Sequence, residues 1–262
     1  MSTLLALGDS HTFGAEILGE DNHYDPANSE LAYPQKLGDQ LGFDKVVNLA
    51  VSGGSNMRIE RSLLEYLTTS GDKPDLVVIG WTVIGRFEYC NGLNGNGDYQ
   101  YANINSWLNP AWDTSSELYT LWKNFLPITT ADDILAQKYR SVLYAMNLLE
   151  NKNIPYIMFD VMNNHINQAE TESGDVLEWN GDHKTDKALY TATECTNYLR
   201  GENMDYWSYV FNSGFEDVQM NGGHANEAGH QRWAEKIKQE LTERNIYGEK
   251  KETFVVTGIN RK

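Results

Sequence analysis

Strand-like and helix-like patterns of hydrophobic residues alternate along most of this chain. Short apolar runs between turn residues are typical of buried strands, and they occur at residues 4–7, 45–50, 75–81 and 155–159. Apolar positions at helical spacing predict helices between these runs, over residues 33–41, 55–67 and 131–150. Such alternation implies right-handed crossovers and a parallel sheet with helices on both faces. We therefore predict a single α/β domain over residues 1–262, a three-layer α/β/α structure with a central parallel sheet.

Two stretches interrupt this alternation. Residues 85–127 are rich in Asn, Gly, Trp and Tyr without sustained periodicity, and residues 163–181 are polar. Long irregular insertions in compact domains are often lids or binding loops. The aromatic residues of the first insertion would form either a platform for a sugar ring or, as we favour, a satellite core under the loop. They are Tyr99, Tyr101, Trp107, Trp112 and Trp122.

Composition narrows the possible partners. Hydrophobic residues make up 40% of the chain, which is enough for a packed core rather than disorder. The net charge of −16 argues against nucleic acids and anionic membrane surfaces as partners, because both require a basic patch. No apolar run approaches the roughly 18 residues of a membrane span. A small molecule or a glycan is therefore a better candidate partner, and the oligomeric state stays open.

The N-terminal segment and the cysteines favour a cytosolic protein. Residues 1–3 lead directly into the first predicted strand, without the basic segment and cleavage site of a signal peptide. The spacing of Cys90 and Cys195 indicates neither a disulfide framework nor a metal site. We expect a soluble, cytoplasmic or virion-associated protein with free thiols.

The first predicted strand ends in Gly8-Asp9-Ser10. Ligands of open α/β sheets bind outside the carboxyl ends of the strands. A small, exposed serine at that edge is a candidate nucleophile. Gly, Asp and Ser are also ordinary turn formers, so this segment alone does not separate the two interpretations.

A second block near the other end of the chain favours the nucleophile interpretation of Ser10 over an ordinary turn. Residues 221–230 read Asn-Gly-Gly-His-Ala-Asn-Glu-Ala-Gly-His and precede a clear helical pattern. Together the two blocks resemble the SGNH hydrolase (GDSL esterase/lipase) superfamily, with Ser10 at the nucleophile and His224 at the base. Asn226, Gly229 and His230 fit the pattern that follows the base. The resemblance implies a flavodoxin-like α/β/α fold and a serine esterase. The alternative for His224 is an unpaired loop histidine.

The residue that orients the base departs from the family pattern. The family places Asp three residues before the histidine, where this chain has Asn221. An Asn carbonyl accepts a hydrogen bond, but it lacks the charge that stabilises an imidazolium. Another carboxylate, such as Glu216 or Asp217, or a backbone carbonyl would then take this role. We retain Asn221 as a catalytic candidate beside these alternatives.

The donors for an oxyanion are partly recognisable. Residues 48–56 resemble the second family block and assign a backbone N–H to Gly53, a residue that would also suit a simple strand-to-helix turn. The third family block carries an Asn, and Thr82 stands at that place with a shorter hydroxyl donor. With the N–H of Ser10, these residues form the predicted oxyanion hole.

Residues 81–88 resemble a variant third block of phage-encoded members of the superfamily. Candidate substrate-binding residues are Asp9, Asn56 and Arg86. For Arg86, an ordinary ion pair with Glu88 is the favoured alternative.

Two hypotheses follow. The first is a serine esterase that cleaves an O-acyl ester, for which an O-acetylated glycan is a reasonable substrate. The second is a catalytically impaired binding or structural module, for example of a virion, and the substitutions at Asn221 and Thr82 favour it. A metal hydrolase has little support, since the six histidines form no HExxH motif and no ligand pair at helical spacing. We expect neither a metal nor a cofactor.

Overall fold

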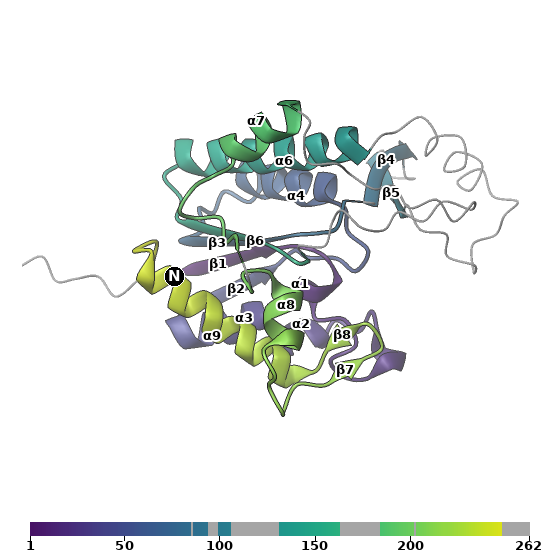
Figure 1. Ribbon diagram of the computed structural model, residues 1–262, viewed down its shortest axis with the longest axis vertical. Helices are drawn as coiled ribbons and strands as arrows, with labels where there is room; N and C mark the ends of the chain where they lie inside the picture. The colour runs from purple at the N-terminus through teal and green to yellow at the C-terminus, as the bar shows by residue number, and fades with distance from the viewer. Residues whose placement is uncertain (85, 94–98, 106–130, 163–183, 202, 248–262) are drawn as a thin grey trace, which may run out of the picture.

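The computed structural model describes residues 1–84, 86–93, 99–105, 131–162, 184–201 and 203–247 (Figure 1). Its centre is a parallel sheet of four strands in the order β2-β1-β3-β6. The strands are β1 (Thr3–Leu7), β2 (Lys45–Asn48), β3 (Leu76–Trp81) and β6 (Tyr156–Asp160). The predicted parallel sheet is confirmed. Its order is that of the flavodoxin-like α/β folds, in which the chain reverses direction across the sheet between β1 and β3.

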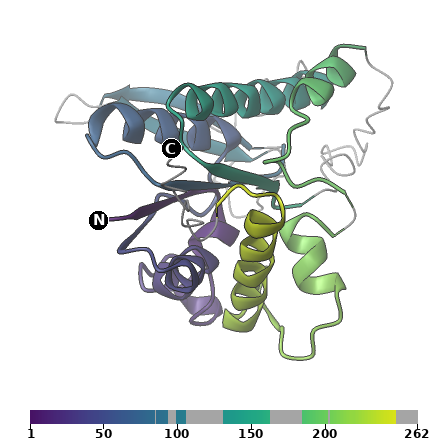
Figure 2. The same ribbon diagram turned by 90° about the vertical axis from the view of Figure 1, so that its left-hand side faces the viewer.

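Helices cover both faces of the sheet, so the predicted three layers are confirmed (Figures 1 and 2). One layer contains α4 (Asn56–Thr69) and α6 (Ala131–Asn151), with α7 (Lys184–Ala192) packed against α6. The other contains α3 (Tyr33–Leu41), α8 (Tyr206–Asn212) and α9 (Glu227–Glu243).

The helix starts are set by their capping residues. Ser55 precedes α4 and accepts a hydrogen bond from the Arg58 N–H at 3.1 Å. Asn226 caps α9 in the same way through the Gly229 N–H at 3.2 Å. Each side chain satisfies a backbone donor that has no partner within the first turn of its helix. The predicted helices over residues 33–41, 55–67 and 131–150 are confirmed to within about two residues.

The period of two in β1 divides the core into two halves. Leu4 and Ala6 belong to the cluster under α3, α8 and α9, whereas Leu5 and Leu7 belong to the cluster under α4 and α6. All four side chains are fully buried. Successive residues of a strand point to opposite faces, so a strand covered on both sides is apolar throughout.

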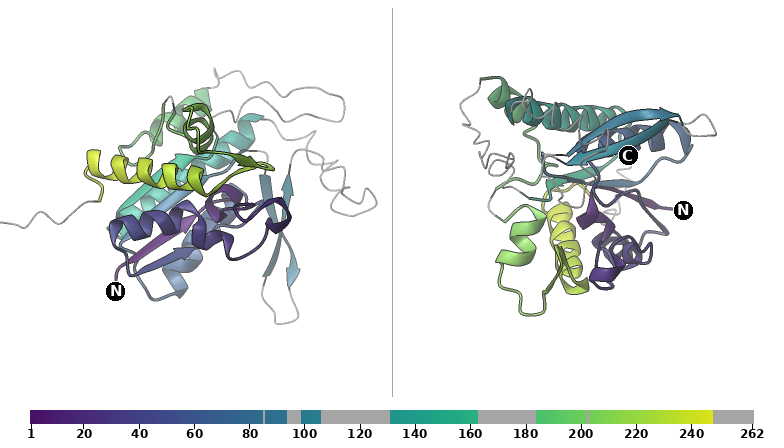
Figure 3. Two further views of the ribbon diagram at one scale, coloured as in Figure 1. Left: turned by 90° about the horizontal axis from the view of Figure 1, so that it is seen from below. Right: turned by 90° about the vertical axis from the view of Figure 1, so that its right-hand side faces the viewer.

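Part of the insertion expected to be irregular has regular structure. Strands β4 (Arg86–Leu93) and β5 (Tyr99–Asn105) form an antiparallel hairpin, which extends beside the carboxyl end of the sheet (Figures 1 and 3). An irregularity in the register between Cys90 and Gly92 interrupts the alternation that would reveal a strand in the sequence. The predictions for Trp107, Trp112, Trp122 and residues 163–181 fall outside the described residues.

Several short elements have no clear pattern in the sequence. They are α1 (Ser10–Phe13), the 3₁₀ turn η1 (Glu20–Asn22), α2 (Asn28–Leu31), β7 (Met220–Asn221) and β8 (His224–Ala225). Elements of two to four residues are too short for a hydrophobic period. Cys90 and Cys195 are free thiols, as expected. Across the described ranges, no helix has the length and apolar character that crossing a bilayer requires.

His230 connects α9 to α3 inside the core. Its side chain is fully buried, and its Nδ1 atom accepts the Tyr33 N–H at 3.2 Å. Burial lowers the pKa of His230 well below its usual value, and the nearby His11, His224 and Lys36 add to this effect. The native protein therefore keeps this imidazole neutral under mildly acidic conditions in which the unfolded chain binds a proton.

We expect this linkage to destabilise the protein at acidic pH. Below the unfolded-state pKa of about 6.5, the free energy of unfolding should fall by up to about 1.4 kcal/mol per pH unit for each such histidine. Urea unfolding between pH 4.5 and 7.5 measures this slope. His230→Asn retains an acceptor for the Tyr33 N–H but does not titrate, so its slope should be shallower. An unchanged slope in this variant would contradict the assignment.

Candidate active site

The candidate residues gather where β1 and β3 end. Gly8, Asp9 and Ser10 follow β1, and Thr82 follows β3 directly. The order of the strands makes this edge the topological switch point, where the chain leaves the sheet toward opposite faces. The position predicted for Ser10, just beyond the carboxyl end of the first strand, agrees with this placement.

A tight turn delivers Ser10 to the start of α1. Asp9 caps this helix and accepts the His11 N–H at 3.0 Å. A side chain at Gly8 would place its Cβ atom 2.0 Å from Thr12 Oγ1, so the turn requires glycine there. Ser10 is 3% exposed, so the expectation of an exposed serine at this edge is wrong. Its N–H donates to no other residue in the described part of the chain.

The loop before α4 lies against this turn. The Val51 N–H donates to the Gly8 carbonyl at 3.3 Å, and the Gly54 N–H closes the loop on the Val51 carbonyl at 2.9 Å. Gly53 has a φ of +77°, which favours glycine. Like that of Ser10, its N–H has no acceptor among the residues that the structure describes. Two unpaired backbone donors thus lie on adjoining segments.

Thr82 is engaged with Asp9. The Thr82 hydroxyl donates to Asp9 Oδ2 at 2.6 Å, and the Arg86 guanidinium donates to the same oxygen at 2.9 Å. A hydroxyl has a single hydrogen to donate, so this bond uses the hydrogen that an oxyanion would need. Burial alone would raise the pKa of Asp9, but Arg86, His11 and Thr82 together lower it below its usual value. Asp9 is therefore a buried carboxylate.

The candidates Asn56 and Arg86 support the same turn. The Asn56 side chain accepts the Thr82 N–H at 2.9 Å and donates to the Thr82 carbonyl at 3.1 Å. The ion pair predicted between Arg86 and Glu88 is wrong. Arg86 instead pairs with Asp9, and Glu88 pairs with Arg61 at 2.8 Å. The reason is tertiary, because Arg86 meets the Asp9 carboxylate beyond the end of β1, whereas Glu88 meets Arg61 of α4.

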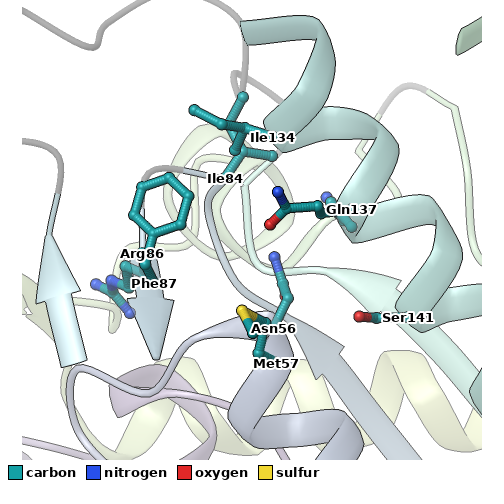
Figure 4. Close-up of a pocket in the computed structure, with 9 residues that line it drawn as sticks. Asn56, Met57, Ile84, Arg86, Phe87, Ile134, Gln137 and Ser141 are labelled. Carbon is teal, nitrogen blue, oxygen red and sulfur yellow. The ribbon is translucent and has the colours of Figure 1, made fainter. Parts of the chain in front are cut away.

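A shallow hollow adjoins this cluster (Figure 4). It holds about 250 Å³ of empty space, part of it open to solvent. Asn56 and Arg86, which contact Thr82, also line the hollow. The rest of its wall is mostly apolar at the hairpin end and polar along α6: Met57, Ile84, Phe87, Ile134, Gln137, Lys138 and Ser141.

The base candidate His224 comes from the β7–β8 turn, which brings it against α1. Its ring centroid lies 4.6 Å from that of His11, the residue after Ser10. No hydrogen bond joins Ser10 Oγ to His224 in the described coordinates of these two residues. The fold therefore brings both candidates to one edge without pairing them directly.

The carboxylate that orients His224 is Glu16. Its Oε2 atom lies 2.7 Å from His224 Nδ1. Asn221, the family-aligned position, instead donates its amide to the Glu16 backbone carbonyl at 3.3 Å. The alternative Asp217 pairs with Arg232 at 2.9 Å. Sequence comparison missed Glu16 because it lies 208 residues from His224 and outside every family block.

The two residues before His224 are glycines that contact the Glu16 side chain. Gly222 has a φ of +57°, and a Cβ atom there would lie 2.5 Å from Glu16 Oε2. The Gly223 N–H donates to the same oxygen at 3.0 Å. The glycine two residues before this candidate base thus marks a place where another side chain approaches the backbone closely.

Two further residues, not predicted, complete this cluster. Glu16 Oε1 lies 2.9 Å from His23 Nδ1, and His23 Nε2 lies 2.5 Å from Ser52 Oγ. Among the described residues, Glu16, His23 and His224 also form a set of potential metal ligands, with donor atoms within 4.8 Å of one another. Two histidines and a carboxylate are a known donor set for zinc. Residue spacing did not indicate this set, because the three side chains meet only in the folded chain.

The charges in this cluster follow from its hydrogen bonds. Burial alone would raise the pKa of Glu16, but donors from His224, His23 and Gly223 outweigh it and lower the pKa. An ionised carboxylate only accepts, so the Nδ1 atoms of both histidines carry hydrogens. His224 Nε2 is then free to accept a proton. Burial lowers the pKa of the neighbouring His11 to about 4, which keeps that ring neutral near pH 7.

Fold and site together define an α/β protein of flavodoxin-like strand order with serine, histidine and carboxylate side chains at the switch point. The chain belongs to DUF6071, a family of unknown function, whose model matches residues 17–176. The matched stretch includes His23, Ser52 and Thr82 but neither Ser10 nor His224. No curated protein matches the chain significantly.

Solved structures of several G-D-S-L proteins and esterases are similar to this chain. A protein described as a lipolytic G-D-S-L family member from Desulfitobacterium hafniense is 14% identical, with a TM-score of 0.46 over 92% of this chain and 100% of the other. The esterase EstA from Pseudoalteromonas is 12% identical, with a TM-score of 0.46 over 93% and 98%. A G-D-S-L protein from Veillonella parvula is 12% identical, with a TM-score of 0.44 over 92% and 99%.

The tautomer of His224 can be tested directly. We expect ¹⁵N–¹H spectra near pH 7.5 to show a hydrogen on Nδ1, at low field because an ionised carboxylate accepts it, and a bare Nε2 atom. Glu16→Gln should move this proton signal upfield or abolish it. A His224 ring protonated at Nε2 in the wild type would contradict the assignment.

Proposed function

We propose that this protein hydrolyses acyl esters, with Ser10 as the nucleophile, His224 as the general base and Glu16 as the carboxylate that orients the base. The observation that carries this proposal is the 2.7 Å contact between Glu16 Oε2 and His224 Nδ1. It supplies the negative charge that Asn221 lacks. Glutamate replaces aspartate in this role in known serine hydrolases.

In the proposed reaction, Ser10 Oγ attacks the ester carbonyl carbon while His224 Nε2 takes the hydroxyl proton. The tetrahedral intermediate then collapses, the C–O bond to the alcohol breaks, and His224 returns the proton to the leaving oxygen. Water repeats these steps on the acyl-enzyme and releases the carboxylic acid. Glu16 stabilises the imidazolium that forms in each half of the cycle.

The oxyanion would be held by backbone donors. The N–H groups of Ser10 and Gly53 lie on adjoining segments without other acceptors in the described residues. Thr82 has a different role in this proposal, because its hydroxyl donates to Asp9 and so holds the turn that presents Ser10. A bond between Ser10 and His224 would form as substrate binds, since such bonds are often long in unliganded sites.

The proposal defines the substrate only by its class, an acyl ester. The hollow lined by Met57, Phe87 and Ile134 adjoins the Asp9–Thr82 cluster, and the proposal assigns it no particular substrate. The O-acetylated glycan remains a prediction, as does a binding or structural role in a virion. The hypothesis of a binding or structural module rested on the substitutions at Asn221 and Thr82. Under this proposal, Glu16 supplies the carboxylate that Asn221 lacks.

Removal of each member of the triad tests this function. We expect the wild type to hydrolyse p-nitrophenyl acetate and to be labelled by a fluorophosphonate, and Ser10→Ala to lose both. Glu16→Gln should reduce kcat by about 10⁴-fold, the scale for losing the orienting carboxylate of a serine protease. Asp217→Asn changes a carboxylate that pairs with Arg232 rather than with His224 and should leave kcat unchanged. Equal rates for wild type and Ser10→Ala would exclude this mechanism for such esters.

Asn221→Asp tests whether Glu16 or the residue at the family-aligned position 221 orients His224. If Asn221 were an impaired triad member, this substitution would raise the rate. We instead expect kcat to stay level or to fall, because the new carboxylate would face the Glu16 carbonyl that now accepts the Asn221 amide. Initial rates on p-nitrophenyl acetate decide between the two, and a tenfold increase would refute the role of Glu16.

A further inference from the structure

We propose that His23 is a positioning residue which, with Ser52, holds the Glu16 carboxylate in place and connects the base to the oxyanion loop. This inference rests on the proposed function. It is carried by a continuous chain of contacts from His224 through Glu16 and His23 to Ser52, with distances of 2.7, 2.9 and 2.5 Å.

Glu16 needs a second anchor on physical grounds. It sits outside the regular helix with a φ of +65°, and its side chain has more rotatable bonds than an aspartate. His224 and the Gly223 N–H both contact Oε2, so those two donors leave rotation of the carboxylate group poorly restrained. His23 contacts the other oxygen, Oε1, at 2.9 Å. Donors on both oxygens fix the plane of the carboxylate and with it the orientation of the His224 ring.

Glu16 determines which nitrogen of His23 carries its hydrogen, and the Ser52 hydroxyl adapts to it. The ionised Glu16 carboxylate accepts a hydrogen bond from His23 Nδ1–H. In a neutral ring Nε2 then carries no hydrogen, so it accepts a hydrogen bond from the Ser52 hydroxyl. Ser52 lies between Val51, which is tied to Gly8, and Gly53, the proposed oxyanion donor. The same contacts that hold the base therefore also restrain the loop that holds the oxyanion.

The same side chains would suit zinc, but the geometry favours hydrogen bonding. The two imidazoles approach different oxygens of one carboxylate through Nδ1, and both contacts meet distance criteria for hydrogen bonds. The His23 and His224 rings meet edge to face with centroids 5.3 Å apart. Activity that depends on bound zinc would therefore overturn the proposal.

A pair of His23 variants separates its two contacts. His23→Asn places an amide near the former Nδ1 position and can still donate to Glu16, but it loses Ser52. His23→Gln reaches toward the former Nε2 position and can still contact Ser52, but it loses Glu16. Circular dichroism and thermal unfolding establish that each variant is folded. Ser52→Ala removes the outer contact alone.

We expect His23→Gln to lower kcat by about tenfold to 100-fold with little change in KM, the scale of a misplaced catalytic group. The low-field His224 Nδ1 proton should shift or broaden in the same variant. His23→Asn should restore most of kcat and the proton signal. Ser52→Ala should cause a smaller loss of kcat, because Glu16 retains all its donors.

Three results would overturn the proposal. One is wild-type kcat and an unchanged proton signal in His23→Gln. Another is equal losses in His23→Asn and His23→Gln, which would indicate a general packing role. The third is wild-type activity that EDTA abolishes and zinc restores. If Ser10→Ala were as active as wild type, the proposed function would fail, and the proton signal would still test whether His23 positions Glu16.

Discussion

The carboxylate of Glu16 carries a negative charge at a point where three donors converge on it. His224, His23 and the Gly223 N–H hold it from separate parts of the chain. Buried or half-buried charge is stable only where such donors replace water. The burial of Glu16 would favour its neutral form, yet the donors outweigh burial and lower its pKa. Without that charge, the β7–β8 turn would present His224 with no partner for its Nδ1 hydrogen.

A second buried carboxylate, Asp9, organises the turn that carries Ser10. It caps α1 and accepts from both Thr82 and Arg86, so the ends of β1 and β3 are joined through one side chain. The two carboxylates lie on either side of α1 in the chain and hold different residues. Asp9 fixes where Ser10 emerges from the sheet, and Glu16 fixes the ring of His224.

The alternation of buried strands and amphipathic helices determined the α/β/α architecture from sequence alone. Strands β1, β3 and β6 are covered on both faces, so their apolar runs are continuous, and residues such as Ser55 and Asn226 cap helices through local contacts. Ser10, Gly53 and His224 became candidates through short sequence blocks that resemble the superfamily, and their catalytic roles stay predictions. The β4–β5 hairpin was missed because an irregular register and its polar residues obscure the period of two.

Only the tertiary structure decided which carboxylate contacts His224. Glu16 and His224 are 208 residues apart, and no local pattern can pair side chains at that separation. The same holds for His23 with Ser52 and for Arg86 with Asp9, whose ion pair replaced the expected contact to Glu88. Sequence specifies elements through interactions along a few residues of chain. Charges and hydrogen-bond donors find their partners only after packing of the sheet has brought distant loops to one edge.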